Sequence, residues 1–112
     1  MVTAISTALA GLNAASTRVA VRGENIANAQ SEGYRVGVPV QTAQAAGPVV
    51  RVERAPADKA QTKIPGTDLV ASQVDLASEL TDLIISGAAY KASAKVLKAA
   101  SEMEKEALDI LA

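Results

Sequence analysis

The C-terminal third of the chain carries a long helical pattern of apolar positions. Between residues 74 and 111, apolar or small side chains recur at alternating steps of four and three, and Gly87 is the only glycine or proline in the run. So narrow a stripe is typical of a helix that pairs with another helix as in a coiled coil. We predict a helix over 73–112 whose pairing and assembly residues are Leu76, Leu80, Leu83, Tyr90, Leu97 and, after a shift of register, Leu108 and Leu111.

Residues 3–29 repeat this pattern near the other end of the chain. Its stripe includes the small residues Ser16 and Gly23, and alanines lie between the stripe positions, so that another helix can approach closely. Because a narrow stripe cannot bury itself, the two stripes predict an antiparallel helix pair that brings both chain ends together. The larger stripe residues of this first helix are Ile5, Leu9, Leu12, Val19 and Ile26.

The region between the two helices changes to a period of two. Valines alternate with other residues over 34–54, on either side of the segment AQAAG, which predicts a small β hairpin. Pro39 lacks an N–H group, so its strand is expected at a sheet edge or with a bulge. Residues 55–72 contain a Pro-Gly turn and no periodicity, which predicts a loop. The expected fold class is mainly α: a single domain over 1–112 with two long terminal helices and a hairpin and loop between them.

Composition limits the core and the kinds of partner. The 112 residues include two tyrosines but no Phe, Trp, His or Cys, and alanine supplies much of the apolar content. Burial stabilises by about 25 cal/mol per Å², so an alanine-rich core gives modest stability, and we expect neighbouring chains to add to it. A net charge of −1 argues against a nucleic-acid partner. No apolar run reaches the roughly 20 residues of a membrane span, and the start lacks the basic segment of a cleaved signal peptide.

Residues for catalysis or for holding a cofactor are not apparent. Without His or Cys there is neither the usual general base nor a thiolate, and no glycine-rich phosphate loop is present. We therefore predict no enzyme and no catalytic, cofactor-binding or metal-binding residue. The acidic C-terminal segment is expected to be a solvated helix face with a Lys98–Glu102 pair. Four basic residues are expected to be available to such a surface on a neighbouring chain: Arg51, Arg54, Lys59 and Lys63.

Two segments resemble the signatures of the bacterial flagellar rod and hook proteins. The first runs from Ala4 to Arg35 and includes the motif residues Asn25, Ile26, Ala27, Asn28, Gly33 and Tyr34, with Glu24 where the family usually has Asn. The second is the helix beginning QVDLASEL, with Val74, Asp75 and Glu79 at matching positions and departures at Gln73, Ala88 and Ser93. The short stretch between the two segments makes the chain most similar to the short proximal rod proteins.

This resemblance implies a structural subunit of the flagellar basal body rod. It implies polymerisation through the terminal helices into a helical axial tube that transmits torque. The implied partners are other copies of the chain, other rod proteins and the flagellar type III export apparatus, without nucleic acid or membrane insertion. The implied location is the periplasmic rod, reached without a cleaved signal peptide.

Other interpretations remain open from the residues. A helical adaptor or chaperone-like module would use the same apolar stripe to receive a partner peptide. A membrane-surface helix would need lysine and arginine along its polar face, and the acidic C-terminal segment contradicts it. We expect Asn25 and Asn28 to end the first helix rather than to bind a ligand, and Tyr34 to anchor the root of the hairpin. Tyr90 is expected to face Gly23 or Val19.

Overall fold

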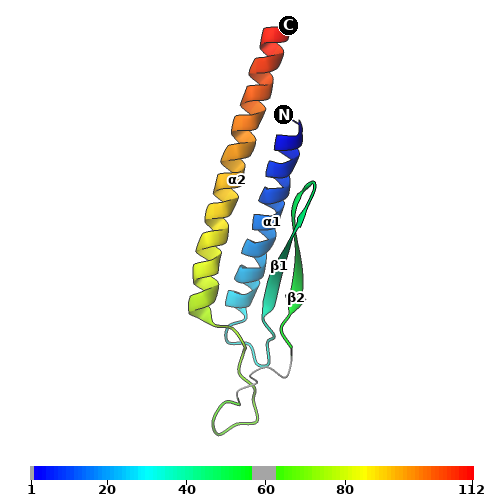
Figure 1. Cartoon of the computed structure of the whole chain (residues 1–112). Coiled ribbons are helices and arrows are strands. Elements are labelled where there is room, and N and C mark those ends of the chain that lie inside the picture. The colour runs from blue at the N-terminus through cyan, green and yellow to red at the C-terminus, as the bar shows by residue number, and fades with distance from the viewer. Residues whose placement is uncertain (1, 57–62) are drawn as a thin grey trace.

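The protein is mainly helical, with two helices on either side of a β hairpin in sequence. We describe residues 2–56 and 63–112 in a computed structural model (Figure 1). The elements are α1, Val2–Ala27; β1, Gly37–Gln44; β2, Gly47–Arg54; and α2, Leu76–Leu111. The predicted fold class is confirmed. The first helix begins one residue earlier than predicted and ends two residues earlier, and the second begins three residues later.

The two helices lie antiparallel along each other, and the hairpin runs along a different side of α1 (Figure 1). The molecule is long and thin, with extents of 75 × 22 × 14 Å. Both chain ends lie at the same end of the helix pair, and α2 extends past the start of α1 (Figure 1). The loop before α2 occupies the opposite end (Figure 1).

Local side-chain hydrogen bonds explain where each helix stops or starts. After Ala27, the Asn28 side chain donates through Nδ2 to the Glu24 carbonyl at 2.9 Å, which satisfies one of the last carbonyls of α1. Gly33 then turns the chain with a positive φ of 64°. At the start of α2, the Asp75 side chain is the N-cap and accepts a hydrogen bond from the Ser78 N–H at 3.4 Å.

The hairpin begins three residues later than predicted, but its two strands are longer and more regular than the sequence indicated. Its strands pair without interruption from Gly37 opposite Arg54 to Gln44 opposite Gly47, so the connecting turn is only two residues, 45–46, rather than the whole AQAAG segment. Pro39 lies opposite Val52 in this continuous register, with no bulge. In a two-stranded sheet both strands are edges, which is where Pro39 was expected.

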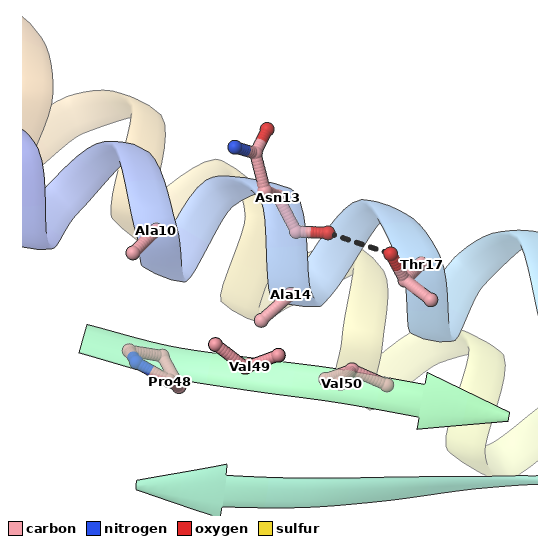
Figure 2. A pocket seen from close by; sticks show the side chains of 7 residues that line it. All are labelled: Ala10, Asn13, Ala14, Thr17, Pro48, Val49 and Val50. Atoms are coloured by element: carbon pink, nitrogen blue, oxygen red, sulfur yellow. Dashed lines mark hydrogen bonds between the residues drawn. The ribbon is translucent and has the colours of Figure 1, made fainter. Parts of the chain in front are cut away.

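The hairpin packs against α1 through small side chains. Ala10 and Ala14 of α1 lie over Pro48, Val49 and Val50 of β2 (Figure 2). At the hairpin tip, Gly47 has a φ of 119°, and a Cβ added there would lie 2.6 Å from the Ala10 Cβ. The tip therefore reaches this close to the helix because the residue has no side chain.

The line along which the helices bury each other differs from the predicted leucine stripe. The buried apolar residues of the described chain are Ala8, Ala14, Ala15, Val21 and Ala100. On α2 the inner line runs through Glu79, Ser86 and Ala100, and Ser93 lies so close to Gly11 that an added Cβ would be 3.2 Å from its Oγ. Small residues at intervals of seven allow the two helix axes to approach closely, and this approach moves the larger side chains to the flanks.

The predicted pairing residues are consequently exposed or half-buried. Leu9, Leu76, Leu80 and Tyr90 are 42–48% exposed, so the prediction that they form the buried seam within the chain is wrong. Leu108 and Leu111 are 62% and 83% exposed and also lie outside the seam. The other six are half-buried at its edges: Ile5, Leu12, Val19, Ile26, Leu83 and Leu97.

Candidate functional site

Both helices and the root of the hairpin meet at Asn25, whose side chain is fully buried. Its Nδ2 donates to the Gly37 carbonyl at 2.8 Å and to the Glu79 Oε2 at 3.0 Å. Its Oδ1 accepts from the Gly37 N–H at 2.9 Å and from the Tyr34 hydroxyl at 3.0 Å. One side chain of α1 thus holds the start of β1 and the first turn of α2 together.

Glu79 brings a buried charge into this junction. It is 5% exposed, and its carboxylate accepts two hydrogen bonds from Arg22 Nη1, at 3.1 and 3.2 Å, besides the one from Asn25. The Nη2 of Arg22 lies 3.2 Å from Asp82. Glu79 also lies in the first turn of α2, where the helix dipole favours a negative charge. Removing one member of such a buried pair typically costs about 3–5 kcal/mol, because the other charge is left without a partner.

We refer to Arg22, Asn25, Tyr34, Gly37 and Glu79 together as the polar clasp. Gly37 belongs to it through its backbone alone, and an added Cβ would lie 3.2 Å from Val21 Cγ1 and 3.4 Å from Asn25 Oδ1. The absence of a side chain at Gly37 is therefore what lets the hairpin backbone reach the buried amide.

An exposed arginine covers the outside of the clasp. Arg54 forms a 2.8 Å salt bridge with Glu24 and donates to the Tyr34 hydroxyl at 3.0 Å, while its guanidinium carbon lies 5.6 Å from the Tyr34 ring centre. These contacts, with the Glu24 hydrogen bond first, raise the pKa of Arg54 above its ordinary value. A raised pKa means that the contact weakens only when the pH rises through the arginine range, so Arg54 stays charged throughout ordinary conditions.

A second set of contacts joins the segment that follows α1 to the segment that precedes α2. The Ser72 hydroxyl donates to the Asn28 carbonyl at 3.0 Å, and the Gly33 N–H donates to the Val70 carbonyl at 2.8 Å. The Gln73 N–H donates to the Tyr34 carbonyl at 3.1 Å. The segment before α2 is therefore held against the segment that follows α1.

The structure confirms some of the expected roles and corrects others. Asn28 does end α1, and Tyr34 does anchor the root of the hairpin. Asn25 does not end the helix, because it lies inside α1 and its amide bonds other elements. Asp75 is the N-cap of α2. Of the remaining motif residues, Ile26 and Val74 are half-buried and Ala27 is exposed.

Three residues of this region were not predicted from the sequence: Arg22, Gly37 and Asp82. The available signal was positional, since Arg22 follows Ala8 and Ala15 at intervals of seven and thus lies on the inner line of α1. A charged residue on an inner line indicates an oppositely charged partner on the facing helix.

The expected pair between Lys98 and Glu102 is present at 3.8 Å. Two of the four basic residues expected to meet a neighbouring chain have partners in their own chain instead: Arg51 pairs with Glu53, and Arg54 with Glu24. Lys63 is exposed. Lys59 lies outside the described residues.

Two family models match the chain, one at each end. The model described as flagella basal body rod protein matches residues 5–35. The model described as flagellar basal body rod FlgEFG protein C-terminal matches residues 69–110. The chain belongs to the flagellar basal body rod protein family. No curated protein matches it.

The polar clasp joins the two matched segments of this rod protein. Asn25 lies in the first matched range and Glu79 in the second, and their side chains are 3.0 Å apart. The family is a structural one, and its members are components of the flagellar basal body rod. The hydrogen bonds of the Asn25 amide, the Tyr34 hydroxyl and the Glu79 carboxylate hold separate elements of the protein together.

The rod protein exposes many large apolar side chains on α2. The most exposed are Ile84 at 73%, Ile85 at 60%, Leu108 at 62%, and Ile110 and Leu111 at 83% each. No helix within residues 2–56 and 63–112 is long and apolar enough to cross a bilayer. Exposed apolar surface on this scale is typical of a protein that packs against other chains.

Proposed function

We propose that this chain is a structural subunit of the flagellar basal body rod, which polymerises through its terminal helices into a helical axial tube. The family supports assembly with other rod components. As a part of that tube in the periplasm, the subunit transmits torque. The proposal includes export through the flagellar type III apparatus without cleavage of a signal peptide, which the family resemblance supports.

The observation that carries the proposal is the unsupported end of α2. No described residue after Ala100 is buried, and α2 projects beyond the start of α1 (Figure 1). We call residues 101–111 the overhang. It exposes Met103, Leu108, Ile110 and Leu111, although apolar side chains of this size are stabilised by burial. An isolated helix end of this length is marginal in water, so the overhang supports a protein that is completed by other chains.

The decisive test is self-association of the full chain. We expect sedimentation to show growth into species much larger than a monomer as the concentration rises, and electron microscopy to show thin rods. Helical content measured by circular dichroism should rise in parallel, because the overhang becomes ordered when it is covered.

A pair of variants makes this test specific. Leu111→Glu should reduce self-association roughly tenfold or more, because association would bury the new charge away from water without a partner. Thr42→Glu adds the same charge at an exposed hairpin position and should leave association within about twofold. A chain that is fully helical when dilute and stays monomeric when concentrated contradicts the proposal; that behaviour belongs to the adaptor alternative.

A further inference from the structure

An open groove lies between α1 and α2 on one side of the helix pair. We define it by the residues that line it: Ser16 and Val19 of α1, and Gly87, Tyr90 and Lys91 of α2. Its volume is about 370 Å³ and its lining is mostly apolar. Tyr90 is 42% exposed beside Val19, so the tyrosine faces one of the two residues expected from the sequence. Leu80 and Leu83 precede Gly87 by seven and four positions and therefore lie on the same side of α2.

The opposite flank of α2 carries a second apolar stripe. Its members are Ile85, Ala92, Val96, Met103 and Ile110, at steps of seven, four, seven and seven. All five are exposed, and the last two belong to the overhang. Such steps keep the residues on one face of a helix. An apolar face of this kind can pack into the groove between two other helices.

The charges beside the groove and beside the second stripe are opposite in sign. Lys91 lines the groove, whereas Lys98 pairs with Glu102 of its own chain and Lys105 belongs to the overhang. Glu102 and Glu106 accompany the second stripe along the overhang. All five side chains are exposed. The lysine that lines the groove and Glu106 beside the second stripe are therefore complementary charges on two surfaces of one chain.

We propose that the groove receives the overhang of a second copy of this chain. Met103 and Ile110 of the incoming helix pack on Val19 and Tyr90, and Glu106 lies beside Lys91. The groove and the overhang are different surfaces of the same molecule, so the contact is heterologous and each subunit can bind two others. This inference rests on the proposed rod function and specifies which surfaces the copies use.

The geometry fixes the displacement between neighbouring copies. When Glu106 of one copy lies level with Lys91 of a neighbour whose α2 runs in the same direction, the two chains are offset by 15 positions of α2. At 1.5 Å per residue, the offset along the helix axis is about 22 Å. Repeated addition at this offset builds an open chain rather than a closed dimer.

Charge reversal tests the contact directly. Lys91→Glu and Glu106→Lys should each weaken self-association about three- to tenfold, because each places like charges beside each other at every contact. The double variant restores opposite charges and should recover most of the association. Lys63→Glu, at the exposed loop on the opposite end of the molecule, is the control and should change association less than twofold.

Disulfide trapping locates the contact independently of its strength. The chain has no cysteine, so any disulfide reports an introduced pair. Mixing Lys91→Cys with Glu106→Cys under oxidising conditions should give a cross-linked dimer, whereas Lys63→Cys mixed with Glu106→Cys should not. Cross-linking through Lys63→Cys in place of Lys91→Cys would show that the overhang docks on the loop end and would overturn the inference.

Different results overturn the groove contact and the rod function. Self-association that is unaffected by both charge reversals and gives no Lys91→Cys cross-link overturns the groove contact and leaves the rod proposal standing. A chain that does not self-associate at any concentration overturns both.

Discussion

Asn25 uses the full bonding capacity of its amide. Its nitrogen donates both hydrogens, to Gly37 and Glu79, and its oxygen accepts from Gly37 and Tyr34. Among side chains of this size only a primary amide offers two donors and two acceptors together. Because the site is fully buried, any replacement leaves at least one polar group there without a partner.

We expect Asn25→Asp to destabilise the protein by about 2–4 kcal/mol at neutral pH. The new carboxylate would accept where the amide donates and would face the Glu79 carboxylate, which lies 3.0 Å from the amide nitrogen. Urea unfolding followed by circular dichroism measures the loss. The matched control is Asn13→Asp on the exposed face of α1, expected to change stability by less than about 0.5 kcal/mol. Equal effects of the two variants would contradict a structural role for the clasp.

The hairpin is held to α1 by close contact rather than by large side chains. Ala10 and Ala14 face β2 across a narrow gap (Figure 2), and Gly47 provides the closest approach at the tip. At the root, the backbone N–H and carbonyl of Gly37 form hydrogen bonds with the Asn25 side chain. The tip of the hairpin tolerates little added volume, because the Ala10 Cβ and the backbone of Thr7 lie directly against Gly47.

Gly47→Ala should therefore cost about 2–4 kcal/mol, because it combines an unfavourable positive φ with a Cβ contact of 2.6 Å at Ala10. Gly23→Ala should act in the other direction. No atom lies within 4 Å of an added Cβ at Gly23, so removing a helical glycine should stabilise α1 by about 0.5–1 kcal/mol. Thermal unfolding of both variants provides the measurement. A destabilising Gly23→Ala would show that this position is covered by something other than solvent.

Periodicity predicted which elements form but not how they face each other. The steps of three and four along 74–111 identify a helix, and Asp75 before Leu76 marks its start. The leucine stripe failed as the seam because α2 has apolar residues on both flanks, as Leu80 and Ile85 show, so the pattern leaves the packing line undetermined within a wide arc. The size of the side chains decides which line of α2 packs against α1, since helices approach closest where residues are small.

The clasp was predicted only in part for a related reason. Asn25, Tyr34 and Glu79 belong to the family motifs, but the motifs do not say that these three side chains meet. Their meeting depends on a contact between positions 54 residues apart, which no local pattern encodes. From the local sequence alone, Arg22 and Glu79 are expected to be exposed to solvent. They become largely buried only because the two helices pair.

At the scale of the whole molecule, α2 has 36 residues and α1 has 26, so the pair cannot match in length. Contacts between Gly11 and Ser93 place the start of α1 near residue 102 of α2. The overhang then continues for about 15 Å without a partner in its own chain. The molecule is thus firm at the clasp and progressively less supported toward both chain ends.

Hydrogen exchange should reveal this gradient. In dilute protein, amides of residues 103–111 should exchange close to the unprotected rate, whereas those of residues 79–97 should be protected at least a hundredfold, because protection follows buried contacts. In concentrated protein the overhang should gain protection. The gain should be absent from Leu111→Glu and present in Thr42→Glu. Strong protection of the overhang at all concentrations would mean that the monomer alone stabilises it.

The polar clasp draws its members from both ends of the polypeptide, with Arg22 and Asn25 early and Glu79 late. A fragment that stops before α2 would keep a guanidinium and an amide facing an empty side of α1, with no carboxylate to receive them. A fragment without α2 should therefore be incompletely folded and cleaved readily by proteases, whereas the chain that contains α2 should resist cleavage. Closure of this one contact therefore requires both helices of the same chain.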